Sequence, residues 1–187
     1  WTITLHLFFA LIIIGLQLYV IRLVSPSQTQ HIHLSKELYI LVWLCFVITA
    51  VQMFLGTQVR ESIDALTRLG IGREQWTESL GLPFFIHRSF SWLLLITIAL
   101  LSYRVYRFSK DQSEASYSGK EGFILLGYAI PIGVMSQVMI GIGLQWLDMP
   151  GVLQVLHLLG VALLLSVIFI FVLILSQRTR AFEEVGS

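Results

Sequence analysis

The chain has 187 residues and a formal net charge of +1, with 56% apolar and only 12% charged residues. A soluble domain carries roughly 25% charged residues, so this deficit excludes an ordinary soluble protein. The mean hydropathy of +0.81 points the same way. The expected partner is the lipid bilayer, and nothing in the composition indicates binding to nucleic acid.

Five stretches are long and apolar enough to cross a membrane, since a span needs about 20 mostly apolar residues. Lipid offers no hydrogen-bond partners to the backbone, so these stretches must be helices. The predicted fold class is therefore an all-α membrane protein with five transmembrane helices, the second to fifth of which form a four-helix bundle. The expected spans cover residues 2–24, 38–58, 86–106, 122–146 and 152–176.

The Lys and Arg residues between the spans predict the orientation, because cytoplasmic loops carry an excess of them. The larger group comprises Arg22, Lys36, Arg104, Arg107, Lys110, Lys120, Arg178 and Arg180. The smaller group comprises Arg60, Arg68, Arg73 and Arg88. We therefore expect Trp1 outside and the C-terminus in the cytoplasm.

The connections and the cysteine carry less information. The external connection at 59–85 has apolar residues at helical spacing (Ile63, Leu66 and Leu69), which predicts a short helix on the membrane surface. The single cysteine, Cys45, lies within an apolar run and is interpreted as a small core residue. A single cysteine forms no disulfide within the chain.

A Leu-His-Leu string occurs near the outer end of the first span, at His6, and of the fifth, at His157. If the two are equivalent, the repeat unit is four helices long. Residues 1–24 are then the last helix of an incomplete N-terminal half, residues 37–177 a complete half, and residues 178–187 a cytoplasmic tail. Chance recurrence in Leu-rich helices is the alternative interpretation.

The five histidines form two groups. His31 and His33 lie in a cytoplasmic loop, whereas His6, His87 and His157 lie within spans near their outer ends. Ionisable residues in a bilayer are costly and usually functional. Because imidazoles from two helices can clamp one heme iron from both faces, we predict that His87 and His157 ligate heme and that helices two to five form a heme-binding bundle. Histidines hydrogen-bonded between helices are the alternative.

Small and basic residues surround these histidines. Gly160 lies on the same helix face as His157, and the fourth span has several glycines, which could make room for a macrocycle or serve helix packing. Arg60 and Arg88 are candidates to bind heme propionates, or they simply end spans in water. Zinc is less favoured, because no third ligand follows a zinc pattern.

With these residues in view, the chain resembles the C-terminal part of the heme A synthase family over nearly its whole length. The strings that carry the resemblance are Thr4-Leu5-His6-Leu7, Gly56-Thr57-Gln58-Val59-Arg60-Glu61, His87-Arg88-Ser89, Gly141-Ile142-Gly143-Leu144-Gln145 and Leu153-Gln154-Val155-Leu156-His157-Leu158. The family has eight spans in two four-helix halves. The resemblance therefore implies that this chain corresponds to spans four to eight.

The resemblance also implies a function. The family oxidises a methyl group of heme O to the formyl group of heme A by successive hydroxylations and loss of water. It implies a heme b held by His87 and His157 that relays electrons, and a substrate heme O held in part by His6. The family's catalytic glutamate lies in the N-terminal half and has no counterpart here, so no catalytic residue is assigned within this chain.

Two other functions stay open at this point: a membrane cytochrome b that only carries electrons, and a respiratory-complex subunit without heme-modifying activity. The expected location is the bacterial cytoplasmic membrane. The partners to be tested are heme O synthase, the assembly of terminal oxidases, and further copies of the chain.

Overall fold

The computed structural model describes residues 2–24, 36–111 and 120–185, and every element in these ranges is helical. The long helices lie close to the predicted spans, and among the described residues five helices are long and apolar enough to cross a membrane. The prediction of an all-α membrane protein is therefore confirmed. The elements are α1 (Thr2–Val24), α2 (Lys36–Arg68), η1 (Arg73–Gln75), α3 (Trp76–Ser79), α4 (Gly81–Asp111), α5 (Lys120–Trp146) and α6 (Gly151–Val185).

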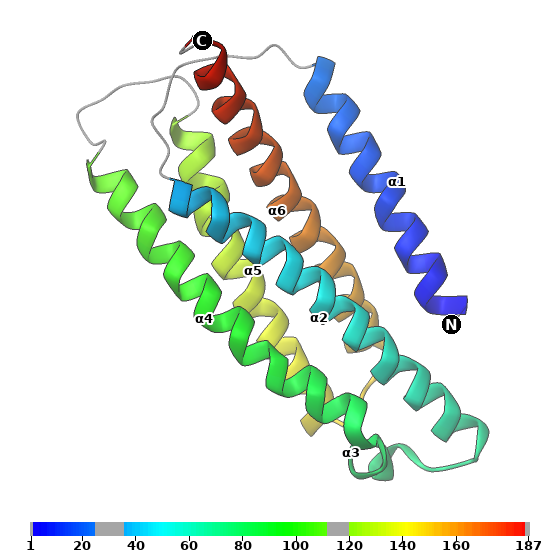
Figure 1. The fold of residues 1–187 in the computed structure, drawn as a ribbon. Coiled ribbons are helices and arrows are strands. Elements are labelled where there is room, and N and C mark those ends of the chain that lie inside the picture. Colours follow the sequence, from blue (N-terminus) through cyan, green and yellow to red (C-terminus); the bar gives the residue numbers. More distant parts are fainter. Residues whose placement is uncertain (1, 25–35, 112–119, 186–187) are drawn as a thin grey trace.

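Helices α2, α4, α5 and α6 form the predicted four-helix bundle. Each packs against two others, in the order α2, α4, α5, α6 and back to α2, so α4 and α6 are not neighbours in this ring. Figure 1 shows the four long helices running together, with α1 beside them. Sequence neighbours thus pair as two hairpins, α2 with α4 and α5 with α6.

The main core fills the middle of this bundle and the end that holds the start of α2 and the C-terminal half of α4. Cys45, Leu101, Ile130 and Phe171 come from the four different helices, and each is completely buried. The interpretation of Cys45 as a core residue is therefore confirmed. Close packing of apolar side chains, rather than helix propensity, holds such helices in register.

The external connection differs from the expectation of a short surface helix. Helix α2 continues without a break to Arg68, about three turns beyond the predicted end of the span. Ile63 on this extension packs with Trp76, Leu80 and Met149 in a second, smaller apolar core. Charged residues lower the hydropathy beyond residue 58, but the apolar side chains keep their helical spacing and find partners within the protein.

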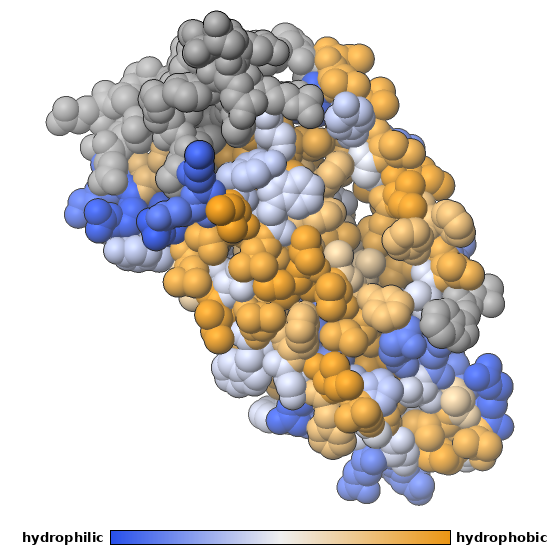
Figure 2. Space-filling model, viewed as in Figure 1, coloured by the Kyte–Doolittle hydropathy of each residue, from blue (hydrophilic) through white to orange (hydrophobic). Residues whose placement is uncertain are grey.

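The surface matches a membrane environment. Figure 2 shows apolar side chains over the middle of the bundle and over α1, with hydrophilic side chains gathered toward the two ends. Large apolar side chains such as Phe9, Trp92 and Leu163 are more than half exposed. A patch of this extent on a soluble protein would be a liability, whereas lipid solvates it.

Candidate functional site

His87 lies near the outer end of α4 and turns toward α2. A Cβ atom built on Gly56 of α2 would lie 3.4 Å from Cε1 and 3.8 Å from Nδ1 of His87. The imidazole therefore packs in the space that the missing side chain of Gly56 leaves. Gln52, one turn earlier on α2, donates a hydrogen bond of 2.8 Å from Nε2 to the backbone oxygen of His87.

His157 has a matching position in the other hairpin. It lies near the outer end of α6, and a Cβ atom on Gly141 of α5 would lie 3.8 Å from its Cε1. Each intramembrane histidine of the bundle therefore stands on the second helix of its hairpin, against a glycine on the first. Small residues of this kind let helices and rings approach closely in membranes.

The two histidines stand on α4 and α6, which are not neighbours in the ring, and each faces a glycine of the adjacent helix. Nδ1 of His87 and Nδ1 of His157 are both buried, and within the described part of the chain neither has a hydrogen-bond partner. A buried polar atom without a partner costs about 1–3 kcal/mol, so such a pair in one region is typical of a site that holds a ligand.

This donor set fits heme better than a bare metal ion. Among the described residues, no group of three or more His, Cys, Asp or Glu side chains could hold a metal. A porphyrin supplies the equatorial ligands of its iron itself, so two imidazoles from opposite helices complete the coordination. The structure places His87 and His157, the predicted ligands, on two different helices of the bundle, and imidazole is a donor that suits the iron of such a group.

The outer end of the bundle is closed by a polar network that includes Arg60. This guanidinium binds Asp64 at 2.9 Å and donates to Gln154, which lies one turn before His157 on α6. Gln154 in turn donates 2.7 Å to the backbone oxygen of Met149 in the turn between α5 and α6. Arg60 therefore stands at the mouth of the bundle beside the helix that carries His157.

Arg88 differs from Arg60. It follows His87 on α4, where successive side chains point about 100° apart, and it is exposed. The structure thus puts a cation at the outer mouth through Arg60, and a second one on the outer flank of α4 through Arg88. His31 and His33 lie outside the described residues.

His6 is not part of the histidine pair. It is exposed on α1, and it is absent from the side chains of α1 that face the bundle, such as Thr4, Leu7 and Leu11. At 100° per residue, His6 lies on the opposite face of α1 from these side chains. Any group that His6 binds is therefore held on the far side of α1 from His87 and His157.

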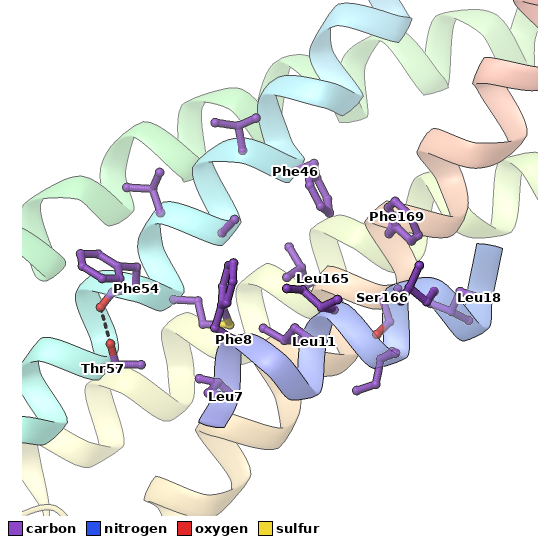
Figure 3. Close-up of a pocket in the computed structure, with 18 of the residues that line it drawn as sticks. Leu7, Phe8, Leu11, Leu18, Phe46, Phe54, Thr57, Leu165, Ser166 and Phe169 are labelled. Atoms are coloured by element: carbon purple, nitrogen blue, oxygen red, sulfur yellow. Dashed lines mark hydrogen bonds between the residues drawn. The ribbon is translucent and has the colours of Figure 1, made fainter. Parts of the chain in front are cut away.

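An apolar cavity of about 720 Å³ separates α1 from the bundle. Figure 3 shows Leu7, Phe8 and Leu11 of α1 facing Phe46 of α2 and Phe169 of α6 across it. At its outer end Thr4 is 2.9 Å from the Glu61 carboxylate and 3.2 Å from the Thr57 hydroxyl. The mostly apolar lining of this cavity suits a hydrocarbon chain.

Sequence reasoning missed two residues near the histidines, Gln52 and Gln137. Gln52 is buried, with 8% of its surface exposed, and Oε1 of each glutamine is a buried atom for which the described residues provide no hydrogen-bond partner. A signal was present, because each glutamine stands four residues before the glycine that faces a histidine.

Taken together, the apolar bundle and its two partly buried imidazoles define an integral membrane protein with a histidine-bearing four-helix bundle. The family comparison makes this specific: the family model of cytochrome oxidase assembly proteins named COX15-CtaA matches residues 1–169. The chain belongs to this family, and the predicted membership of the heme A synthase family is confirmed. The family acts in cytochrome oxidase assembly and heme A biosynthesis. Comparison with curated proteins and with solved structures gave no match.

Proposed function

We propose that this chain is the heme b half of a heme A synthase, together with one helix of the substrate half. The reaction is the oxidation of a heme O methyl group to the formyl group of heme A. In this proposal the bundle of α2, α4, α5 and α6 takes heme b between His87 and His157. Residues 37–177 form this half, residues 1–24 belong to the other, and residues 178–187 are its cytoplasmic tail.

The chain's own residues bind and orient the cofactor. His87 and His157 would hold the heme iron, and the space left by the missing side chains of Gly56 and Gly141 sets where their rings stand. When bound, heme b supplies a one-electron redox centre whose potential depends on its axial ligands and burial. The apolar side chains of the bundle keep water from the ligands, and they favour the form of the cofactor with less net charge.

Arginines and the first helix complete the proposal. Arg60 and Arg88 bind the anionic propionates at the outer face, where a guanidinium forms paired hydrogen bonds to a carboxylate. His6, on the far face of α1, holds the substrate heme O on the other side of this helix. The two hemes are thereby kept apart, with α1 between them.

The observation that carries the proposal is the matched placement of two partly buried imidazoles on non-neighbouring helices. Each faces a glycine of the adjacent helix, and each has a buried Nδ1 without a partner among the described residues. Structural histidines that bridge helices would use both ring nitrogens within the protein. The outward position of His6 further favours a synthase with a second heme site over a carrier whose hemes share one bundle.

The proposal extends to location and partners. We propose the bacterial cytoplasmic membrane, with Trp1 outside and the C-terminus in the cytoplasm. The excess of Lys and Arg at the end of the bundle that holds the α4 and α6 C-termini supports this orientation. Heme O synthase is the expected supplier of substrate, terminal-oxidase assembly the consumer of product, and self-association a further interaction to test.

The test uses the full-length protein in membranes supplied with heme O, followed by analysis of the extracted pigments. A synthase converts heme O to heme A, and its reduced-minus-oxidised spectrum has a b-type band. A b-type band with no heme A would contradict the synthase and leave a membrane cytochrome b. The variant His6→Ala separates the two sites, because it should retain the b-type band of the bundle and lose heme A.

A further inference from the structure

The two hairpins of the bundle repeat one arrangement of three residues. In the first, Gln52 and Gly56 of α2 stand opposite His87 of α4. In the second, Gln137 and Gly141 of α5 stand opposite α6, where Gly141 faces His157. The spacing Gln-x-x-x-Gly puts the glutamine one turn toward the cytoplasm from the glycine, on the same helix face.

The amide groups of both glutamines reach the helix that carries the histidine. Nε2 of Gln52 donates to the backbone oxygen of His87 itself, at 2.8 Å. The amide of Gln137 occupies the space that a side chain at Gly160 would need, one turn beyond His157. Gly160 therefore serves to admit this amide, which gives the glycine a more specific role than general helix packing.

Among the described residues, four buried atoms of these two arrangements have no hydrogen-bond partner. Two are acceptors, Oε1 of Gln52 and Oε1 of Gln137, and two are ring nitrogens, Nδ1 of His87 and Nδ1 of His157. Each hairpin therefore holds one unused acceptor and one unused imidazole nitrogen. A histidine that binds a metal through Nε2 carries a proton on Nδ1, and this proton almost always goes to a carboxylate, a carbonyl oxygen or water.

We propose that Gln52 and Gln137 are positioning residues for the heme site: their Oε1 atoms accept hydrogen bonds from Nδ1–H of His87 and His157 when Nε2 of each histidine binds iron. This inference rests on the proposed function. The hydrogen bond fixes the tautomer and the ring plane, and it makes each imidazole a stronger electron donor. It thereby favours the ferric state and lowers the midpoint potential of the heme.

The two glutamines are not held equally. The amide of Gln52 is anchored by its bond to the His87 backbone, so its oxygen has a fixed place beside the ring. The amide of Gln137 lies against Gly160, where the missing side chain leaves room for it. Loss of Gln52 should therefore change the geometry of its histidine more than loss of Gln137.

The test replaces each glutamine in the full-length protein by leucine, which is of similar size and accepts no hydrogen bond. Gln52→Leu and Gln137→Leu should each raise the midpoint potential and alter the g-values of the ferric heme in electron paramagnetic resonance. Hemin titration of the heme-depleted protein should show affinity weakened by about 10–100-fold, the usual effect of losing such a partner. Gln52→Glu and Gln137→Glu restore an acceptor, and should return the potential to the parent value or below it.

The control is Gln58→Leu on the same helix, since Gln58 is directed to the Thr57 hydroxyl rather than to a histidine. It should leave potential, g-values and affinity unchanged. If both leucine variants match the parent in all three, the positioning role is overturned while the heme site stands. If Gln52→Leu does not accumulate, the midpoint potential, g-values and hemin affinity of Gln137→Leu and of the two glutamate variants test the positioning role instead. A parent protein without a b-type spectrum would instead refute the proposed function.

Discussion

The four-helix bundle and α1 are both long and apolar enough to span a membrane, but their histidines face in different directions. A third of the most apolar part of α2 and of α6 is buried within the protein, whereas none of that of α1 is. His87 and His157 accordingly face the interior, and His6 faces away. A similar position near the end of a span is therefore not enough for histidines to share a site. The face of the helix on which each histidine lies decides whether it points into the bundle.

The largest expected effect concerns the histidines themselves. His87→Ala and His157→Ala each remove one of the two proposed heme ligands, so heme b in the purified full-length protein should fall to background. His6→Ala should retain the parent amount, because His6 is on the far side of α1. Heme content per protein, from the reduced-minus-oxidised spectrum, measures this. Loss of heme b in His6→Ala as well would remove the distinction between bundle and α1.

A second prediction compares a glycine between two helices of the bundle with a glycine between α1 and the bundle. In Gly127→Ala the new Cβ would lie 2.6 Å from Cγ1 of Val105. Val105 is fully buried and β-branched, so its side chain has few other rotamers with which to relieve this contact. Such overpacking costs about 1–3 kcal/mol, which exceeds the gain in helix propensity of about 1 kcal/mol.

The matched variant is Gly15→Ala on α1, where the new Cβ would lie 3.8 Å from the Phe169 ring in ordinary contact. The propensity gain is then unopposed, so Gly15→Ala should be neutral or stabilising while Gly127→Ala lowers the midpoint of thermal unfolding. Equal effects of the two substitutions in detergent would mean that α1 packs as tightly as the bundle.

A smaller effect is expected where α1 is tied to the bundle. Thr4→Val keeps the shape of the side chain and removes its hydrogen bonds to Thr57 and Glu61. Each such bond contributes about 0.5–1.5 kcal/mol. Spin labels on the outer ends of α1 and α2 should therefore report a broader distance distribution, with heme b content unchanged. An unchanged distribution would show that other contacts fix α1.

The smallest effect is expected at the end of the bundle where α2 begins. Arg104 of α4 binds Glu37 of α2 at 2.6 Å, but the two side chains are 47% and 60% exposed. Exposed pairs contribute about 0–1 kcal/mol. Arg104→Gln should therefore shift thermal unfolding less than Gly127→Ala does, and a larger shift would mean that this ion pair, rather than the core, holds α2 to α4.

The sequence predicted the helices well because lipid leaves a long apolar stretch no alternative to a helix. It failed at residues 59–68, where charged residues end the hydropathy signal while Ile63 continues the helical pattern toward Trp76. The sequence also placed His6, His87 and His157 within spans near their outer ends. The side of α1 on which His6 lies depends on how α1 packs against α2 and α6, which no local pattern records.

The glutamines show a different limit. Gln52 and Gln137 read as unremarkable polar residues in apolar helices, and the repeated spacing to a glycine gains meaning only when α4 and α6 are seen opposite them. Gly160 likewise looked like a contributor to space for a macrocycle, and the structure shows the amide of Gln137 against it. Such pairings join residues far apart in the chain.

The most direct test of the account is low-temperature electron paramagnetic resonance of the oxidised full-length protein. Two imidazoles on one iron predict a low-spin ferric signal that disappears in His87→Ala and in His157→Ala and persists in His6→Ala. A high-spin signal in the parent, or a low-spin signal that survives both bundle substitutions, would contradict the assignment of the paired histidines as heme ligands.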